Sequence, residues 1–287
     1  MIEGVNPAWM DFSGSMPQAK TEHVTKKMLD IPYGPHKLQT LDIYYPENGE
    51  GPFPVIVNVH GGGFTHCDKR DFHLYPTLFA LERGFAVAAV NYRLSPKVRY
   101  PAHLADVMRA LNFLGEHAEE YRLDAQNAFL WGTSAGGNLV LHAGCVEGMN
   151  GLIKHTLRIG AVAALCPAAD LEKLSKAPNL RIAFALFLLR SAIFGPFPSK
   201  AALENSKPES FFSGGIAPVY LQHGENDPVI PLQQMRALAG KLSVLLPGED
   251  FVFDVIAGAR HAGDGPDYFM PEHILPILAF FERHIKA

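Results

Sequence analysis

A Gly-x-Ser-x-Gly motif, formed by Gly132, Ser134 and Gly136, is the stretch with the clearest potential for chemistry. A short apolar run at residues 129–131 precedes it and an apolar helical pattern follows, so the serine falls at a strand-to-helix turn. Such a tight turn exposes the serine hydroxyl, and side chains at positions 132 and 136 would collide with neighbouring backbone. Ser134 is therefore the candidate nucleophile, activated by a histidine elsewhere. The alternative is an ordinary glycine-rich turn, because five-residue patterns recur by chance.

A second glycine-rich stretch, His60 to Phe64, directly follows the β-branched run Val55 to Val59. Three consecutive glycines are entropically costly, so a folded chain keeps them where its backbone must approach a ligand closely or adopt positive φ. We expect the backbone N–H groups of Gly62 and Gly63, together with that of Ala135, to form an oxyanion hole. A phosphate-binding loop is the alternative. It is disfavoured because no Lys-Ser/Thr follows and Gly-x-Gly-x-x-Gly is absent.

The partners of the serine are expected after later strands. Asp227 lies in a turn-rich stretch and is predicted to orient the catalytic base, with Glu225 as the rival acid. A helix N-cap is the alternative role for Asp227. His261 lies on a loop of small residues after the last strand and is the predicted base. His273 falls in a helical pattern and is assigned to packing or solvent.

The segment that follows the glycine loop contains four residues that could suggest a metal site: His66, Cys67, Asp68 and His73. A zinc site would require a second spaced pair of ligands, and the sequence does not repeat the pattern. We therefore favour a solvated loop over a metal site.

Strand and helix patterns alternate along most of the chain. Strand candidates cover residues 24–31, 38–45, 55–59, 85–91, 129–131, 159–165, 219–222 and 251–256, and helical patterns begin at Pro101 and cover 138–145, 232–245 and 272–285. Strands separated by helix-length crossovers predict a mostly parallel sheet covered by helices on both faces. The carboxyl ends of such strands gather the functional side chains.

A long segment without a strand pattern interrupts this alternation. Because such segments in compact domains are usually functional, we interpret residues 169–212 as a helical cap inserted into a single domain over residues 1–287. Plain packing between cap and body is the alternative for each of its aromatic residues. The side chains predicted to contact the substrate are Phe64, Phe184, Phe187 and Phe194.

The bulk composition limits the partners. A net charge of -4 without a long basic run disfavours nucleic acid and anionic membranes, so a small neutral molecule is expected. Three widely spaced cysteines, Cys67, Cys145 and Cys166, build no disulfide framework, and the N-terminus lacks the pattern of a secretory signal. We expect a cytoplasmic protein without a membrane-spanning segment. A homodimer is plausible, although the sequence does not require one.

Taken together, these motifs resemble the α/β-hydrolase superfamily, specifically the hormone-sensitive-lipase-like carboxylesterases and the bacterial feruloyl and acetyl xylan esterases. The similarity runs from about Leu38 to the C-terminus. It is carried by His60 to Phe64, residues 91–96, Gly132 to Gly137, Asp227-Pro228 and His261. The order Ser, Asp, His along the chain is also that of this superfamily.

The resemblance implies an α/β-hydrolase fold with an eight-stranded, mostly parallel sheet whose second strand is antiparallel. It also implies that Ser134 is the nucleophile, His261 the base and Asp227 the orienting acid, with no cofactor. One residue departs from the pattern: Thr133 precedes the nucleophile, where lipase-like members usually carry Asp. This difference favours the carbohydrate-esterase branch.

The expected function is therefore hydrolysis of small carboxylic esters by a serine carboxylesterase, with acetyl or feruloyl esters of carbohydrates as candidate substrates. A short-chain lipase-like esterase is one alternative. A prolyl-oligopeptidase-type peptidase is another, but such enzymes usually carry a large additional domain. A non-catalytic binding protein with this fold ranks last, because all three members of the proposed triad are present.

Overall fold

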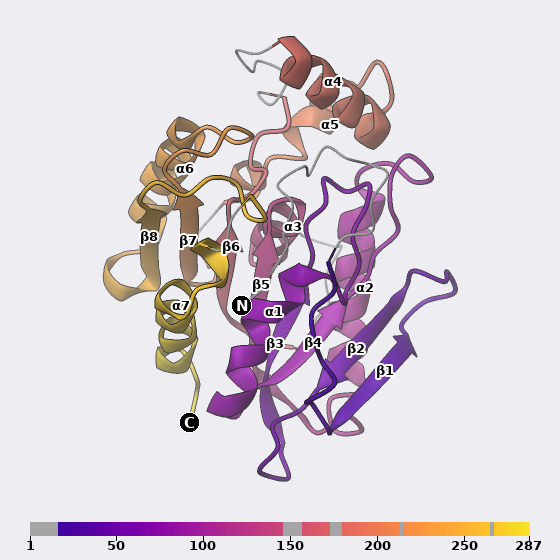
Figure 1. The fold of residues 1–287 in the computed structure, drawn as a ribbon, viewed down its shortest axis with the longest axis vertical. Helices are drawn as coiled ribbons and strands as arrows, with labels where there is room; N and C mark the ends of the chain where they lie inside the picture. Colours follow the sequence, from indigo (N-terminus) through magenta and orange to yellow (C-terminus); the bar gives the residue numbers. More distant parts are fainter. Residues whose placement is uncertain (1–16, 146–156, 173–179, 213–214, 265–266) are drawn as a thin grey trace.

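An eight-stranded sheet runs through the centre of the protein, and Figure 1 shows helices packed around it. The computed structural model describes residues 17–145, 157–172, 180–212, 215–264 and 267–287. The spatial order of the strands is β1-β2-β4-β3-β5-β6-β7-β8. Their bounds are β1 (Lys27–Pro32), β2 (Thr40–Tyr44), β3 (Phe53–Val59), β4 (Ala86–Val90), β5 (Leu123–Thr133), β6 (Ile159–Leu165), β7 (Val219–Gly224) and β8 (Phe251–Ile256).

The sheet is mixed but mostly parallel. Strand β2 runs antiparallel to both β1 and β4, and every other neighbouring pair is parallel. This direction pattern confirms the predicted sheet, including its reversed second strand. Strands β3 and β4 are nearly continuous apolar runs and are almost fully buried, as expected for strands covered on both faces.

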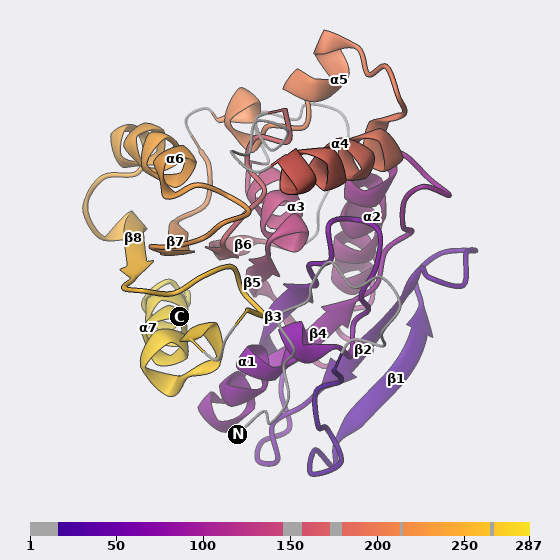
Figure 2. The same cartoon turned by 45° about the horizontal axis from the view of Figure 1, so that its top comes forward.

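Alternate residues of the strands face two separate halves of the core, because successive side chains point to opposite faces of a sheet. Val55 and Val57 pack in the half that contains α2 (Ala102–Glu116), α3 (Ala135–Ala143) and α6 (Leu232–Leu245). Ile56 and Trp131 pack in the half that contains α1 (Tyr75–Leu78) and α7 (Pro271–Arg283). Figure 2 shows the two helical layers on either side of the row of strands.

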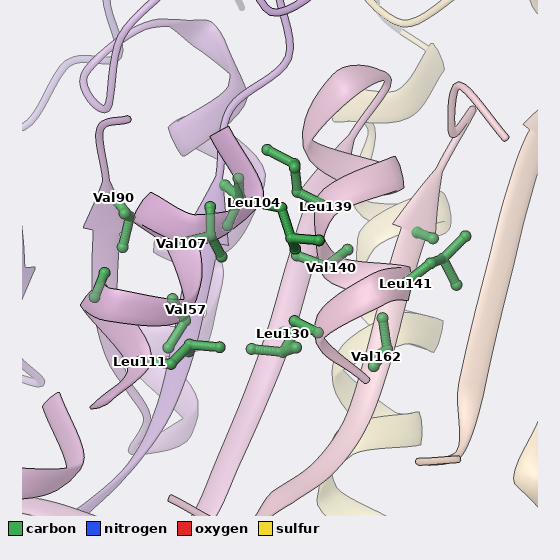
Figure 3. Close-up of a cluster of buried hydrophobic side chains, with 14 of the residues drawn as sticks. Val57, Val90, Leu104, Val107, Leu111, Leu130, Leu139, Val140, Leu141 and Val162 are labelled. Atoms are coloured by element: carbon green, nitrogen blue, oxygen red, sulfur yellow. The ribbon is translucent and has the colours of Figure 1, made fainter. Parts of the chain in front are cut away.

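Helix α2 illustrates how the sequence specifies these layers. It begins directly after Pro101, a residue that is well tolerated at helix starts. Leu104, Val107 and Leu111 follow at three- and four-residue spacing, so their side chains share one face of the helix. Figure 3 shows these side chains beside Val57 of β3 in the buried cluster.

Helices α4 (Leu180–Phe194) and α5 (Lys200–Glu204) belong to the segment predicted as a cap. They lie at the top of Figure 1, beyond the carboxyl ends of β3 and β5. Residues 173–179 of the predicted cap, and residues 1–16 of the N-terminal stretch, lie outside the described residues. None of the helices in the described ranges has the length and hydropathy needed to cross a bilayer.

Candidate active site

Ser134 occupies the sharp turn between the end of β5 and the start of α3. Its backbone has φ 54° and ψ −112°, a conformation that is rarely populated by a residue other than glycine. Hydrogen bonds hold the turn on both sides. The Ser134 N–H donates to the Leu165 carbonyl at 2.8 Å, and the Ser134 carbonyl accepts from the N–H groups of Asn138 and Ala168, each at 3.1 Å.

The glycines beside Ser134 are needed because β3, β5 and α3 approach one another closely here. A Cβ atom on Gly136 would meet the backbone carbonyl of Val59, the last residue of β3. A Cβ atom on Gly132 would lie 2.7 Å from Val140 Cγ2 on α3. The collisions expected at both positions are therefore confirmed, which disfavours the interpretation as an ordinary glycine-rich turn.

Hydrogen bonds connect the three predicted triad residues in the expected order. His261 Nε2 lies 3.0 Å from Ser134 Oγ, and His261 Nδ1 lies 2.7 Å from Asp227 Oδ2. The other oxygen of Asp227 accepts from the N–H groups of Val229 and Ile230, each at 2.8 Å. Asp227 thus both orients the imidazole and fixes its own turn. The alternative role as a helix N-cap is not observed, because Pro231 is the N-cap of α6 and no side chain caps that helix.

Burial and charge set the protonation of this pair. Burial by itself would raise the pKa of the Asp227 carboxyl, but attraction to His261 and their hydrogen bond hold that pKa below its ordinary value. Burial by itself would lower the pKa of His261, but the negative charge of Asp227 outweighs it and raises that pKa well above its ordinary value. Asp227 is therefore ionised at neutral pH, so Nδ1 of His261 carries the proton that Asp227 accepts.

The rival candidates lie elsewhere. Glu225 is exposed, and its carboxylate accepts a hydrogen bond from the Gly258 N–H at 2.9 Å. His273 lies on α7, and its carbonyl accepts from the side-chain amide of Gln222. These contacts assign both residues to structural roles.

The glycine loop after β3 faces the same space as Ser134. Gly62 and Gly63 have φ of 88° and 57°, and both line the pocket that contains Ser134. Ala135 is the first residue of α3, and the first four N–H groups of a helix have no partner within it. This arrangement is consistent with the predicted oxyanion hole.

Tyr92 holds the glycine loop in place. Its hydroxyl lies 3.0 Å from the carbonyl of His60 and 3.1 Å from that of Gly61, and its ring stacks on the His60 imidazole with centroids 4.3 Å apart. In the sequence, Tyr92 stands out only as part of the motif at residues 91–96. Its supporting role depends on β3 and β4 being neighbours, which places the residues that follow them side by side.

A cavity of about 70 Å³ opens beside Ser134 and His261. Helix α4 contributes Leu186, Leu189 and Ile193 to one wall of it. The apolar side chains that line the cavity include Phe64, Phe72, Leu171, Leu186, Leu189, Ile193, Val229 and Ile230.

Of the aromatic residues predicted to contact the substrate, only Phe64 lines this cavity. Phe184 is 60% exposed and Phe187 is 42% exposed, and the ring of Phe194 packs 5.7 Å from that of Tyr100. The structure therefore corrects the predicted position of these three residues as pocket walls. Helix α4 carries large apolar side chains around its whole circumference, so its sequence does not show which face points inward.

The structure also corrects the prediction of a solvated loop for the stretch that was considered as a metal site. His66, Cys67 and His73 line the cavity, and His73 is almost fully buried, so the loop is more enclosed than a solvated loop. Asp71, which the sequence reasoning did not single out, is buried beside His73. Candidate ligand atoms of Cys67, Asp71 and His73 lie within 4.8 Å of one another.

Cys166 is another neighbour of the site that the sequence did not reveal. It follows β6, is fully buried, and places its sulfur within 4.8 Å of candidate ligand atoms of Asp227 and His261. A lone cysteine gives no pattern in the sequence, so its position depends on the fold alone. The three cysteines are free thiols in the structure.

A sequence model of the BD-FAE family matches residues 41–242, which is more than half of the chain. The chain belongs to the BD-FAE family. Esterase LipQ from Mycobacterium tuberculosis is 30% identical over 247 residues, which cover 80% of this chain and 58% of LipQ. This BD-FAE chain thus spans less than two thirds of the length of that relative.

Solved structures share the fold of this BD-FAE chain. A truncated carbohydrate esterase from gut microbiota has a TM-score of 0.79 at 21% identity, over 93% of this chain and 99% of that one. An acetyl ester-xyloside bifunctional hydrolase from Caldicellulosiruptor lactoaceticus has a TM-score of 0.69 at 20% identity, over 94% and 98%. The fold is the α/β-hydrolase fold, as predicted.

Proposed function

We propose that this BD-FAE protein hydrolyses small carboxylic esters through an acyl-enzyme on Ser134. The observation that carries the proposal is the unbroken chain of hydrogen bonds from Asp227 through His261 to Ser134. It ends in a cavity that is lined by Gly62 and Gly63 on another side. Nucleophile, base, orienting acid and backbone donors are thus present at one site.

The chemistry follows from these positions. As Ser134 Oγ attacks the ester carbonyl, Nε2 of His261 takes the hydroxyl proton and then gives it to the leaving alcohol. A water molecule next loses a proton to His261 and attacks the acyl group, which releases the carboxylic acid and restores the serine. The N–H groups of Gly62, Gly63 and Ala135 stabilise the oxyanion in both steps, by about 3 kcal/mol per donor.

The cavity supports a short acyl group. Its volume of about 70 Å³ is small compared with the roughly 300 Å³ or more of pockets that enclose drug-sized ligands. This size favours acetyl over the larger feruloyl group. Two of the structural relatives named above are described as a carbohydrate esterase and an acetyl ester-xyloside hydrolase, so we propose acetyl esters of carbohydrates as the substrate class.

The direct test compares the Ser134→Ala variant with wild-type protein on p-nitrophenyl acetate. We expect turnover by the wild type, none above background for Ser134→Ala, and fluorophosphonate labelling at Ser134 alone. Ser243→Ala, an exposed serine on α6, is the matched control and should keep full activity. Turnover that persists in Ser134→Ala would refute the assignment. A panel of acetyl, butyryl, octanoyl, feruloyl and acetylated-sugar esters then defines the acyl preference.

Partner and location belong to the same proposal. We propose a small-molecule ester as the partner. We also propose the cytoplasm as the location, which the three free thiols support.

A homodimer is supported by the exposed apolar side chains of α4, such as Phe184 and Leu188. Light scattering at several protein concentrations tests it, and a constant monomer mass would exclude the dimer.

A further inference from the structure

A second histidine–carboxylate pair, which the proposed mechanism does not use, lies at the wall of the cavity. His73 Nδ1 lies 2.8 Å from Asp71 Oδ1, and the His73 backbone N–H donates to the same oxygen at 2.9 Å. Asp71 is fully buried, His73 is 3% exposed, and the His73 ring is part of the cavity lining. The pair therefore has the same contact between Nδ1 and a carboxylate oxygen as His261 and Asp227, but it lies on a different loop.

The hydrogen bond to Asp71 fixes which nitrogen of His73 carries the proton. Burial by itself would raise the pKa of Asp71, but the neighbouring His73 and His60 hold that pKa below its ordinary value, so the group is a carboxylate. A carboxylate can only accept, so Nδ1 of His73 must be the donor. In the neutral ring, Nε2 is then a hydrogen-bond acceptor.

The glycine loop makes room for this imidazole. A Cβ atom on Gly61 would lie 2.8 Å from His73 Nε2, so a larger residue at position 61 would displace the ring. The first of the three glycines therefore has a role different from that of Gly62 and Gly63. It brings the Nε2 edge of His73 against the loop that carries the predicted oxyanion donors.

No group in the described part of the cavity gives His73 another catalytic task. His261 already serves Ser134. The nearby Cys67 is a poor nucleophile, because burial and the negative charge of Asp71 raise the pKa of its thiol far above the ordinary value. A histidine acceptor in a mostly apolar cavity is instead suited to a ligand that donates a hydrogen bond.

We propose that Nε2 of His73 accepts a hydrogen bond from a hydroxyl group of the substrate, so that the preferred esters carry a free hydroxyl near the ester bond. This inference rests on the proposed esterase function and narrows its substrate class. The hydroxyl could belong to the alcohol part, as in a partly acetylated sugar, or to the acyl part, as in a hydroxy acid. Both sources present the same donor to His73.

Matched ester pairs separate the two sources. On the alcohol side, 2-hydroxyethyl acetate is compared with propyl acetate, and a monoacetylated methyl xyloside with tetrahydropyranyl acetate. On the acyl side, ethyl glycolate is compared with ethyl propanoate. We expect the wild type to favour the hydroxylated member of at least one arm by about tenfold in kcat/KM, the value of one ordinary hydrogen bond. The arm that shows the preference identifies the source of the hydroxyl.

Three variants connect the preference to His73. His73→Phe removes the acceptor and should bring the ratio of kcat/KM within the pair close to one. His73→Gln keeps an acceptor oxygen and an amide donor for Asp71, so it should retain part of the preference. His117→Phe, at the exposed C-terminal end of α2, is the matched control and should keep the wild-type ratio. Thermal unfolding of each variant verifies folding.

A wild type that treats both members of every pair alike, or a folded His73→Phe that keeps the preference, would overturn the inference while leaving the esterase function intact. Failure of the function itself gives a different result: neither turnover nor fluorophosphonate labelling of Ser134. Ligand-observed NMR with Ser134→Ala measures binding of the same pairs without turnover. There too, preferential binding of the hydroxylated member that depends on His73 is expected, and equal binding would overturn the inference.

Discussion

At the scale of single residues, Asp227 shows how one side chain can serve both architecture and chemistry. One carboxylate oxygen accepts two backbone N–H groups and the other faces the catalytic imidazole. The turn thus aims the carboxylate before a substrate arrives. The informative substitution at Asp227 is therefore one that removes the charge and keeps the shape of the side chain.

Asp227→Asn is predicted to lower kcat by about 10⁴-fold, because an amide no longer holds the imidazole in the required tautomer. The pH dependence should change as well. In the wild type, Asp227 raises the pKa of His261, so the neutral base forms only well above pH 6.5. Without that charge, burial lowers the pKa, and the residual activity should reach its plateau at a lower pH. The measurement is kcat/KM against pH, and an unmoved limb would contradict it.

At the scale of elements, the sharp turn at Ser134 between β5 and α3, called the elbow below, depends on how closely β3, β5 and α3 approach one another. Gly136 lies where any side chain would meet the last carbonyl of β3. We predict that Gly136→Ala destabilises the fold by about 1–3 kcal/mol, the usual effect of overpacking, because backbone must shift to admit the methyl group.

Gly240 provides the matched control for this prediction. It lies within α6, and no atom lies within 4 Å of the place that an alanine methyl group would occupy there. Gly240→Ala should therefore stabilise the protein by about 0.5–1 kcal/mol. Urea unfolding measures both changes. Equal effects of the two substitutions would show that the elbow is not crowded.

Helix α4 offers a second test at this scale, because its faces differ in role. Leu189 lines the cavity and approaches Gly63, whereas Phe187 is exposed. Leu189→Ala should enlarge the cavity and shift the acyl preference from acetyl toward butyryl, as seen in kcat/KM for the p-nitrophenyl ester series. Phe187→Ala should leave the preference unchanged. The same shift in both variants would rule out a selective role of the inner face.

The sequence predicts those elements whose signals are local. Continuous apolar runs identify β3 and β4, and the Gly-x-Ser-x-Gly motif locates the elbow. Strand β5 begins at Leu123, earlier than the expected residue 129, because Asp124, Gln126 and Asn127 lack the apolar signal of a buried strand. The short helical segments after Phe72 were not predicted, since Pro76 and the short runs around it give no sustained helical period.

The site was predictable where chemistry restricts residue types and much less so where packing decides. Ser134, Asp227 and His261 follow from a motif, a chain order and two turn-rich loops. His73 and Asp71 were missed as a pair because Asp-x-His spacing has no meaning until a turn folds the carboxylate back onto the ring.

At the scale of the whole molecule, buried histidines should make stability depend on pH. His60, His103 and His142 are buried, and burial lowers the pKa of each to about 4. In the unfolded chain they titrate near pH 6.5. Between these values the unfolded state binds more protons, so stability that is complete above pH 6.5 is lost as the pH falls. His261, whose pKa is raised, acts in the opposite direction.

We predict that each of these three histidines lowers the free energy of unfolding by about 2 kcal/mol at pH 5 relative to neutral pH. Urea unfolding at pH 5 and pH 7 measures the sum. His103→Leu removes one titrating imidazole, so it should make the pH dependence of the unfolding free energy shallower by about one proton. The Ser95 hydroxyl keeps its hydrogen bond to the Val98 carbonyl in this variant. An unchanged slope would mean that His103 is charged in the native state.

Because of their order along the chain, Ser134 is synthesised well before its base, His261. Ser134 and His261 are 127 positions apart, and the base lies on the loop after β8, the last strand of the sheet. During translation the elbow can form around β3, β4 and β5 long before the ribosome has added the imidazole. A nascent chain therefore carries an inert hydroxyl, and reactivity toward esters begins only after the loop that follows β8 has been synthesised.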